Sequence, residues 1–156
     1  QQLRESKGYT YGIRSGFSGN NFDGRFTISS GVRANATLES IALIRDILHN
    51  YEQGFSQQDL DVTKGFFLKS NARRFETHNA KLNVLANMSE FGLSADYVQQ
   101  RATALEKLTL ADLKALAKSY IHPDKMIYLI VGDAKTQLPR LTALGLGAPV
   151  LLNAKQ

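Results

Sequence analysis

The chain has 156 residues, of which 43% are hydrophobic and 21% charged, a length and composition that fit one globular domain with a single core. Its longest unbroken apolar run, Met126 to Val131, is far shorter than the roughly 20 residues of a membrane helix. The sequence has no cysteine, which excludes disulfides, thiolate metal ligands and cysteine nucleophiles. Disorder and a membrane span are thereby excluded, whereas the redox compartment stays open.

The formal net charge of +5 is unevenly spread. Within residues 64–81, five cations stand against one anion, Glu76. The cations are Lys64, Lys69, Arg73, Arg74 and Lys81. Such a segment is able to neutralise nucleic-acid phosphates, but a basic run on a helix is more often a solvated face. A nucleic-acid-binding module is therefore only a minor alternative.

Two alternating segments near the start of the chain predict an antiparallel hairpin. Residues 10–18 place Tyr11, Ile13 and Phe17 on one side of a strand, and residues 25–32 repeat the pattern. The residues between them are Asn, Asp and Gly around one Phe, and these types tolerate the positive φ values of turns. We expect the three apolar side chains of the first strand to form a half-buried face.

Five helices are predicted between the hairpin and Pro123, each from apolar residues at three- and four-residue spacing behind a capping residue. The expected N-caps are Thr37, Ser56, Thr77, Ser94 and Thr109. Asp59 and Asp112, each three residues after its cap, indicate capping boxes. The second helix is expected to run toward Phe75, and Gly92 follows the third.

The segment Met126 to Val131, MIYLIV, is β-branched and aromatic and predicts a central strand buried on both faces. Leu138 to Leu144 predicts one or two further helical turns. The expected fold class is therefore α+β, with a small, mostly antiparallel sheet covered on one face by several helices. Three strands are few for a domain of this length, so the sheet is expected to be incomplete or covered at its edge.

The chain carries no catalytic motif that we recognise. His49, His78 and His122 have no carboxylate or second histidine at helical spacing, so no zinc site is built locally. Glycine-rich phosphate loops and hydrolase nucleophile elbows are also absent from the sequence. We therefore assign no catalytic residue and no metal ligand to this chain.

The most informative stretch is Leu3 to Gly12, LRESKGYTYG, where an Arg lies seven residues ahead of a Tyr that starts a strand. It resembles the second-domain signature of the insulinase/pitrilysin family of zinc metallopeptidases, the inverzincins, which reads roughly L-R-E-x-x-G-x-x-Y-G. The likeness continues at Gly54 to Leu60, GFSQQDL, and at Leu129 to Asp133, LIVGD. These occupy the family's helix entry and hydrophobic strand, so the resemblance covers nearly the whole chain.

In that family the zinc is held by an inverted H-x-x-E-H motif and a distal Glu in a first domain, and this sequence contains neither. The resemblance implies that the chain is part of the C-terminal, substrate-binding half of a clamshell. Zinc is then expected in the absent N-terminal half, in the same or a separate polypeptide. The resemblance also implies an upstream strand and helix, so residues 1–156 are expected to be a single domain that is incomplete at its N-terminal side.

The resemblance assigns Arg4 and Tyr11 to substrate binding. A guanidinium and a phenol are hydrogen-bond donors that suit a peptide carbonyl. The structural alternative is that Arg4 pairs only with Glu5 or solvent, and that Tyr11 belongs to the core. Gly12 and the nearby Gly16 would let a peptide backbone approach the strand closely, although a twisted or bulged strand needs glycine too.

Three functions follow from these observations. The first is a segment that binds unfolded peptides or small proteins opposite a zinc site carried by the absent half. The second is a non-catalytic peptidase-like partner subunit, and the third is the nucleic-acid-binding module. The isolated chain is expected to be inactive, and to associate with itself through an uncovered sheet edge. A periplasmic or envelope location is compatible with a cysteine-free chain; the substrate, the compartment and the oligomeric state are not fixed by the sequence.

Overall fold

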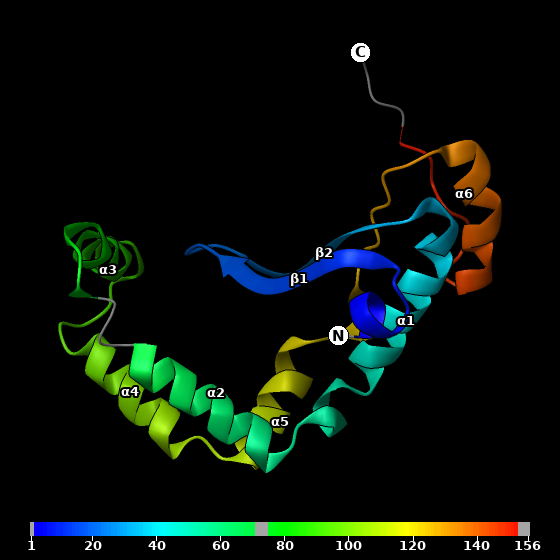
Figure 1. The fold of residues 1–156 in the computed structure, drawn as a ribbon. Coiled ribbons are helices and arrows are strands. Elements are labelled where there is room, and N and C mark those ends of the chain that lie inside the picture. The colour runs from blue at the N-terminus through cyan, green and yellow to red at the C-terminus, as the bar shows by residue number, and fades with distance from the viewer. Residues whose placement is uncertain (1, 71–74, 153–156) are drawn as a thin grey trace. The chain divides into compact units, whose positions relative to one another are not determined.

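The computed structural model describes residues 2–70 and 75–152. Arg73 and Arg74 of the basic segment therefore lie outside the described residues, as does the end of the predicted second helix. The chain divides into two compact units (Figure 1). Unit 1 comprises Gln1–Gly16, Phe26–Asn50 and His122–Gln156, and unit 2 comprises Phe17–Arg25 and Tyr51–Ile121. Helices and a two-stranded antiparallel sheet together confirm the α+β class.

The predicted hairpin is confirmed. Strand β1 (Thr10–Gly19) pairs with β2 (Gly24–Val32). The turn is held by the Asn20 side chain, whose Oδ1 accepts hydrogen bonds from the backbone N–H groups of Phe22, at 2.8 Å, and Asp23, at 3.1 Å. An Asn side chain that binds the backbone two residues on is the reason this residue type starts turns.

The two ends of the hairpin differ in register by one residue. At the base, the Arg33 N–H donates to the Tyr9 carbonyl at 3.1 Å, and at the tip the Asn20 N–H donates to the Asp23 carbonyl at 2.9 Å. The first strand therefore carries one residue more than the second between these pairs, which is a β-bulge. Because a bulge shifts the side-chain alternation, the residues of β1 near the base change sides.

This bulge corrects the expected half-buried face of β1. Thr10 is buried and Ile13 is half-buried as expected, whereas Tyr11 is 98% exposed and Phe17 is also exposed. On β2 the expected alternation holds, since Phe26 and Ile28 are half-buried and Thr27 between them is exposed. At Tyr11 the prediction failed because period-two alternation does not reveal an inserted residue; the bulge does not account for the exposure of Phe17, which has the parity of Ile13.

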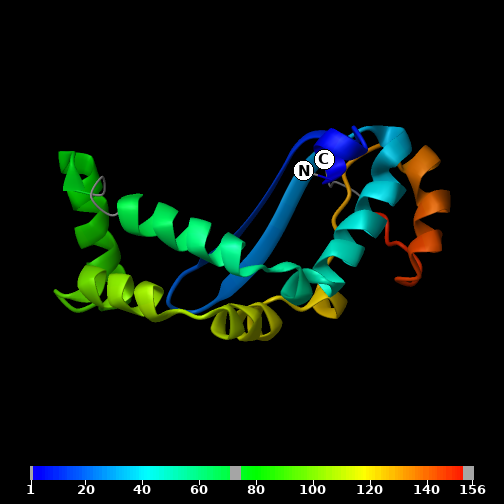
Figure 2. The ribbon, with the colours of Figure 1, turned by 60° about the horizontal axis from the view of Figure 1, so that its bottom comes forward.

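In unit 1, helix α1 (Thr37–His49) packs against α6 (Ala134–Leu141) (Figure 2). Arg140 on α6 donates to the Glu39 carboxylate on α1 at 2.7 Å and to the Asn35 carbonyl at 3.2 Å. The core of the unit contains both small and polar side chains. Its buried residues are Leu3, Thr10, Ala36, Thr37, Ser40, Leu48, Gln137 and Leu141.

Unit 2 contains α2 (Gln57–Ser70), α3 (His78–Phe91), α4 (Tyr97–Lys107) and α5 (Leu110–Tyr120). Helix α2 packs against α4 and α5, and Leu60 is its buried residue. The Lys64 ammonium of α2 donates to the carbonyls of Glu106, at 2.6 Å, and Leu108, at 3.0 Å. A cation on the last carbonyls of α4 satisfies groups that the helix itself leaves unpaired.

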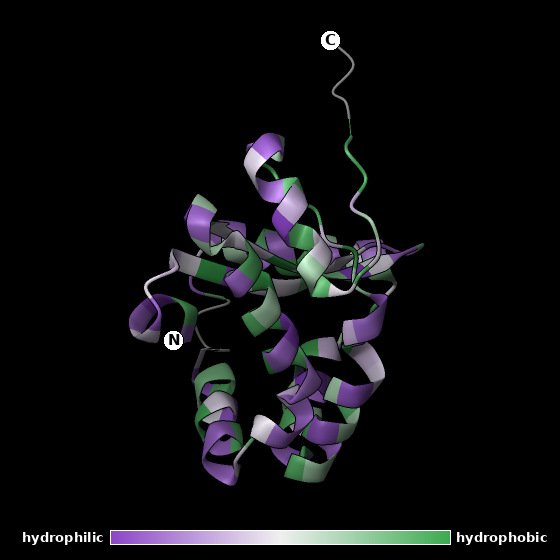
Figure 3. Cartoon of the chain, turned by 90° about the vertical axis from the view of Figure 1, so that its right-hand side faces the viewer, coloured by the Kyte–Doolittle hydropathy of each residue, from purple (hydrophilic) through white to green (hydrophobic). Residues whose placement is uncertain are grey.

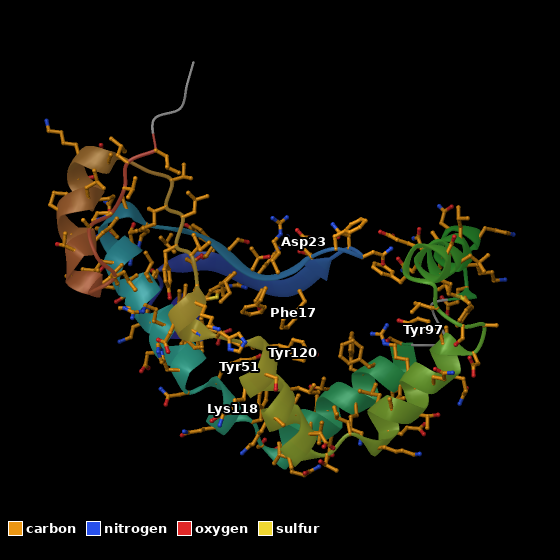
Figure 4. All side chains as sticks on the ribbon, turned by 180° about the vertical axis from the view of Figure 1, so that it is seen from behind. Phe17, Asp23, Tyr51, Tyr97, Lys118 and Tyr120 are labelled. Atoms are coloured by element: carbon orange, nitrogen blue, oxygen red, sulfur yellow. The ribbon has the colours of Figure 1, made fainter. Side chains whose placement is uncertain are left out.

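The tip of the hairpin contacts the helices of unit 2. The Phe17 ring meets the Tyr120 ring of α5 edge to face, with centroids 6.4 Å apart, and the two side chains point toward each other (Figure 4). The Asn21 side chain donates to the Glu90 carbonyl near the end of α3 at 2.6 Å.

Several predicted helix ends are confirmed. Ser56 with Asp59 and Thr109 with Asp112 form the expected reciprocal capping hydrogen bonds. The hydroxyl of each cap, and then its backbone N–H, lowers the pKa of the partner carboxyl. The remaining confirmed ends belong to α3, which starts behind Thr77 and ends at Gly92 in the left-handed conformation, with φ of 61°.

Three predicted ends differ. Thr37 is the first residue of α1, and its hydroxyl donates to the Ala34 carbonyl instead of capping the helix. Helix α4 starts at Tyr97, behind Asp96 rather than Ser94, because the Ser94 hydroxyl donates to the Asp96 carboxylate. The last helix starts earlier than predicted, because the Asp133 carboxylate accepts from the backbone N–H of Lys135 and caps it.

The predicted central strand Met126 to Val131 is not confirmed. The segment pairs with no strand among the described residues, and it is not buried on both faces. Met126, Tyr128 and Ile130 are half-buried, whereas Ile127 and Val131 are exposed. Composition predicts extended backbone, but a strand also needs a neighbour whose N–H and C=O groups face it.

No helix among the described residues is long and apolar enough to cross a membrane. In Figure 3, hydrophilic residues interrupt the hydrophobic ones along the helices.

Candidate functional site

The Leu3 to Gly12 motif folds as a compact turn followed by the start of β1. Gln2–Ser6 form one π-helical turn, in which Leu3 is buried and anchors the segment. The Gly8 N–H donates to the Arg4 carbonyl at 3.1 Å, and the Tyr9 N–H donates to the Leu3 carbonyl at 2.8 Å. Gly8 has a φ of 58°, which a residue with a side chain adopts only at a cost. The motif's glycine is therefore required by the backbone of the turn.

Arg4 lies on this turn with its side chain exposed. Of the structural alternative, which paired Arg4 with Glu5 or solvent, the solvent-exposed arrangement stands, because the guanidinium has no ion-pair partner among the described residues, Glu5 included. Its five N–H donors are therefore available to a ligand.

The backbone on either side of Tyr11 is held by hydrogen bonds of the neighbouring Thr10 side chain. The buried Thr10 Oγ1 accepts hydrogen bonds from the Gly12 N–H at 3.0 Å and the Ser30 hydroxyl at 2.8 Å, and lies 2.7 Å from the Gly31 carbonyl. The hydroxyl thus stands between the two strands at the point where the ladder is interrupted. Since Thr10 occupies the inward position, the Tyr11 side chain is left exposed, and it is not a core residue.

The backbone beside Tyr11 is open. No described atom lies within 4 Å of the position that a Cβ would occupy at Gly12 or at Gly16. Neither glycine is therefore needed for packing within the described chain, and the space over this strand is free for another backbone.

Arg4 and Tyr11 both belong to unit 1, seven residues apart, and no hydrogen bond joins their side chains. The role of Thr10 was missed by sequence reasoning, because a threonine in a strand gives no local sign that it bridges a bulge. Among the described residues, no group of three or more His, Asp or Glu side chains forms a metal-binding cluster.

The pKa of His49 is raised above its ordinary value. Its Nδ1 lies 2.8 Å from the Arg45 carbonyl, and its Nε2 lies 3.1 Å from the Asp124 carboxylate. The hydrogen bond to the Arg45 carbonyl contributes most, and that to Asp124 next. Both partners only accept, so only the imidazolium form donates to both. His49 therefore links α1 to the 3₁₀ turn Pro123–Lys125 through Asp124. It is not part of the motif site.

The described residues of the basic segment form no assembled phosphate site. Lys64 is engaged with the end of α4, while Lys69 and Lys81 are exposed. The described part of this segment therefore matches a solvated helix face with one structural lysine.

Comparison with known proteins gives two informative likenesses. No family model matches the chain. The chain is 26% identical over 139 residues to the non-peptidase homolog YmxG of Helicobacter pylori, which covers 86% of this chain and 32% of that protein. It is also similar to the structure of a peptidase M16 inactive domain from Pseudomonas fluorescens, with a TM-score of 0.71, 28% identity, and coverage of 80% of this chain and 30% of that one.

These likenesses support an M16-like, peptidase-related fold of the non-catalytic kind, in line with the insulinase/pitrilysin resemblance of the motif. The chain spans about a third of the length of either protein it matches.

Proposed function

We propose that this chain is a substrate-binding, non-catalytic part of an M16-like zinc metallopeptidase. In this role it holds the backbone of an extended peptide with Arg4 and Tyr11, opposite a zinc site carried by another part of the enzyme. The observation that carries the proposal is that both motif side chains are exposed donors on hydrogen-bonded backbone, and that the turn and the bulge hold them outward.

The chemistry of the two side chains suits this role. The Arg4 guanidinium can donate two parallel hydrogen bonds, and the Tyr11 phenol can donate one. Hydrogen-bond donors directed at an oxygen stabilise the negative charge that it gains during the reaction. The open backbone at Gly12 and Gly16 leaves room for the main chain of a peptide.

The chain's own residues do not fit a zinc ion. The described histidines and acidic residues form no metal-binding cluster, and the sequence lacks the inverted motif. We therefore assign binding and orientation to this chain, and no metal chemistry.

The test uses the chain together with its zinc-bearing half. Arg4→Ala and Tyr11→Phe are expected to lower turnover by about a hundredfold to a thousandfold, as the loss of one such donor does elsewhere. Their stability is expected to change by only about 0.5 kcal/mol, because both side chains are exposed. Matched controls are Arg101→Ala and Tyr120→Phe, at exposed positions of unit 2 away from the motif. Unchanged turnover in both motif variants, or a loss explained by unfolding, would refute the assignment.

A second candidate function is a non-catalytic partner subunit that supports an active one. It is favoured by the likeness to a protein described as a non-peptidase homolog. In that case the motif variants leave turnover unchanged, while removal of the whole chain abolishes it.

A further inference from the structure

The side chain of Ser30 on β2 reaches across the hairpin to the residues on either side of Tyr11. Its hydroxyl oxygen lies 2.8 Å from the Thr10 Oγ1 atom and 2.9 Å from the Gly12 carbonyl oxygen. Ser30 is half-buried, and all of these residues belong to unit 1. A single side chain of the second strand therefore contacts both neighbours of a motif residue on the first.

The Thr10 hydroxyl cannot serve alone the two carbonyls that lie next to it. It lies 2.7 Å from the Gly31 carbonyl oxygen and 2.8 Å from that of Gly12, and it accepts from the Gly12 N–H at 3.0 Å. A hydroxyl has one proton to donate, so a Thr10 hydroxyl that donates to Gly31 on β2 has none for Gly12. Ser30 supplies a second proton, which reaches the Gly12 carbonyl as well as the Thr10 oxygen. The two hydroxyls together hold the N–H and the carbonyl of Gly12.

The direction of the Tyr11 side chain depends on this backbone. The residue is 98% exposed, so packing within the described chain does not set where the phenol points. Gly12, which follows it, has no described atom within 4 Å of the position of a Cβ, and a glycine backbone is freer than that of any other residue. Hydrogen bonds on both polar groups of Gly12 therefore restrict the segment that carries the phenol.

We infer that Ser30 is a positioning residue of the peptide-binding site. It holds the backbone from Thr10 to Gly12 so that the Tyr11 phenol meets a peptide carbonyl, and it acts through Tyr11 rather than on the peptide itself. The inference rests on the proposed function and deepens it, because it adds a residue of β2 to a site otherwise built from the motif. Without the Ser30 hydroxyl the phenol is still present, but it is free to adopt directions that do not bind.

Hydrogen exchange of the Gly12 amide in the full chain tests the positioning without a peptide. Ser30→Ala is expected to speed this exchange roughly twofold to tenfold, the effect of one lost hydrogen bond. Ser30→Thr keeps a hydroxyl on a residue type that suits a strand, and should restore the wild-type rate. The matched control is Ser29→Ala, at the exposed neighbouring position of β2, which should leave the rate unchanged. An unchanged rate in Ser30→Ala, or an equal increase in Ser29→Ala, would overturn the inference.

Calorimetric titration of the full chain with a synthetic, unstructured peptide that has blocked ends tests the link to Tyr11. Ser30→Ala is expected to weaken binding about twofold to fivefold, and to have no further effect when Tyr11→Phe is already present. An equal loss in both backgrounds would show that Ser30 does not act through the phenol, and would overturn the inference. If Arg4→Ala and Tyr11→Phe weaken binding but Ser30→Ala does not, the inference fails and the proposed function stands. If none of the three alters binding, the proposed function fails and the inference falls with it.

Discussion

Thr10 is the residue that determines where Tyr11 points. Its hydroxyl replaces a direct link between the strands at Gly12 and Gly31. Tyr11 is exposed because Thr10, and not Tyr11, takes the inward position at the bulge. The substrate-binding assignment therefore depends on a neighbour that has no contact with substrate.

Thr10→Val is expected to destabilise the chain by about 1 to 3 kcal/mol, because it keeps the shape of the side chain but leaves its former hydrogen-bond partners unsatisfied. Chemical denaturation measures the free energy of unfolding. The control is Thr27→Val on the exposed side of β2, which should change it by no more than about 0.5 kcal/mol. Equal effects of the two substitutions would show that the hydroxyl has no special role.

His49 makes a pH-dependent contact. Because its pKa is raised in the folded chain, its contribution to stability is complete below the ordinary value of 6.5 and is lost as the pH rises through the folded-state pKa. The thermal midpoint should therefore fall over this interval. His49→Gln, which cannot be protonated, should remove this part of the pH dependence. A variant whose profile parallels the wild-type profile would contradict the assignment.

Among the elements, the helix ends of unit 2 follow local rules. The two capping boxes and the glycine after α3 are predictable because each depends on residues within one turn. The unpaired state of Met126 to Val131 among the described residues and the bulge of β1 are not predictable in this way, because strand pairing depends on residues distant in sequence. The motif residues Arg4 and Tyr11 came from family resemblance, and their exposure required the structure.

Two glycines of unit 2 are expected to respond to alanine in opposite directions. Gly92→Ala should destabilise by about 1 to 2 kcal/mol, because its φ of 61° disfavours a Cβ. Gly65→Ala, inside α2 where a Cβ meets no atom within 4 Å, should stabilise by about 0.5 to 1 kcal/mol. Thermal unfolding of both variants provides the comparison, and a shared sign would contradict this view of the two backbones.

At the scale of the whole molecule, the chain is similar to proteins described as a peptidase M16 inactive domain and a non-peptidase homolog, and its described residues form no metal-binding cluster. We therefore expect the purified chain to bind no zinc stoichiometrically and to cleave no peptide, because it lacks both the ligands and a general base. Elemental analysis after dialysis, together with a peptide-cleavage assay, measures both. Stoichiometric zinc that a chelator removes together with activity would contradict this expectation.

The most direct test of the central claim is the binding of an unfolded peptide to the full chain, followed residue by residue in NMR spectra. We predict that the peptide shifts the signals of Arg4, Tyr11 and Gly12, and that Arg4→Ala or Tyr11→Phe each weakens binding by about fivefold or more, the effect of one lost hydrogen bond. Shifts confined to residues 64–81, or a peptide affinity that neither variant alters, would contradict the account.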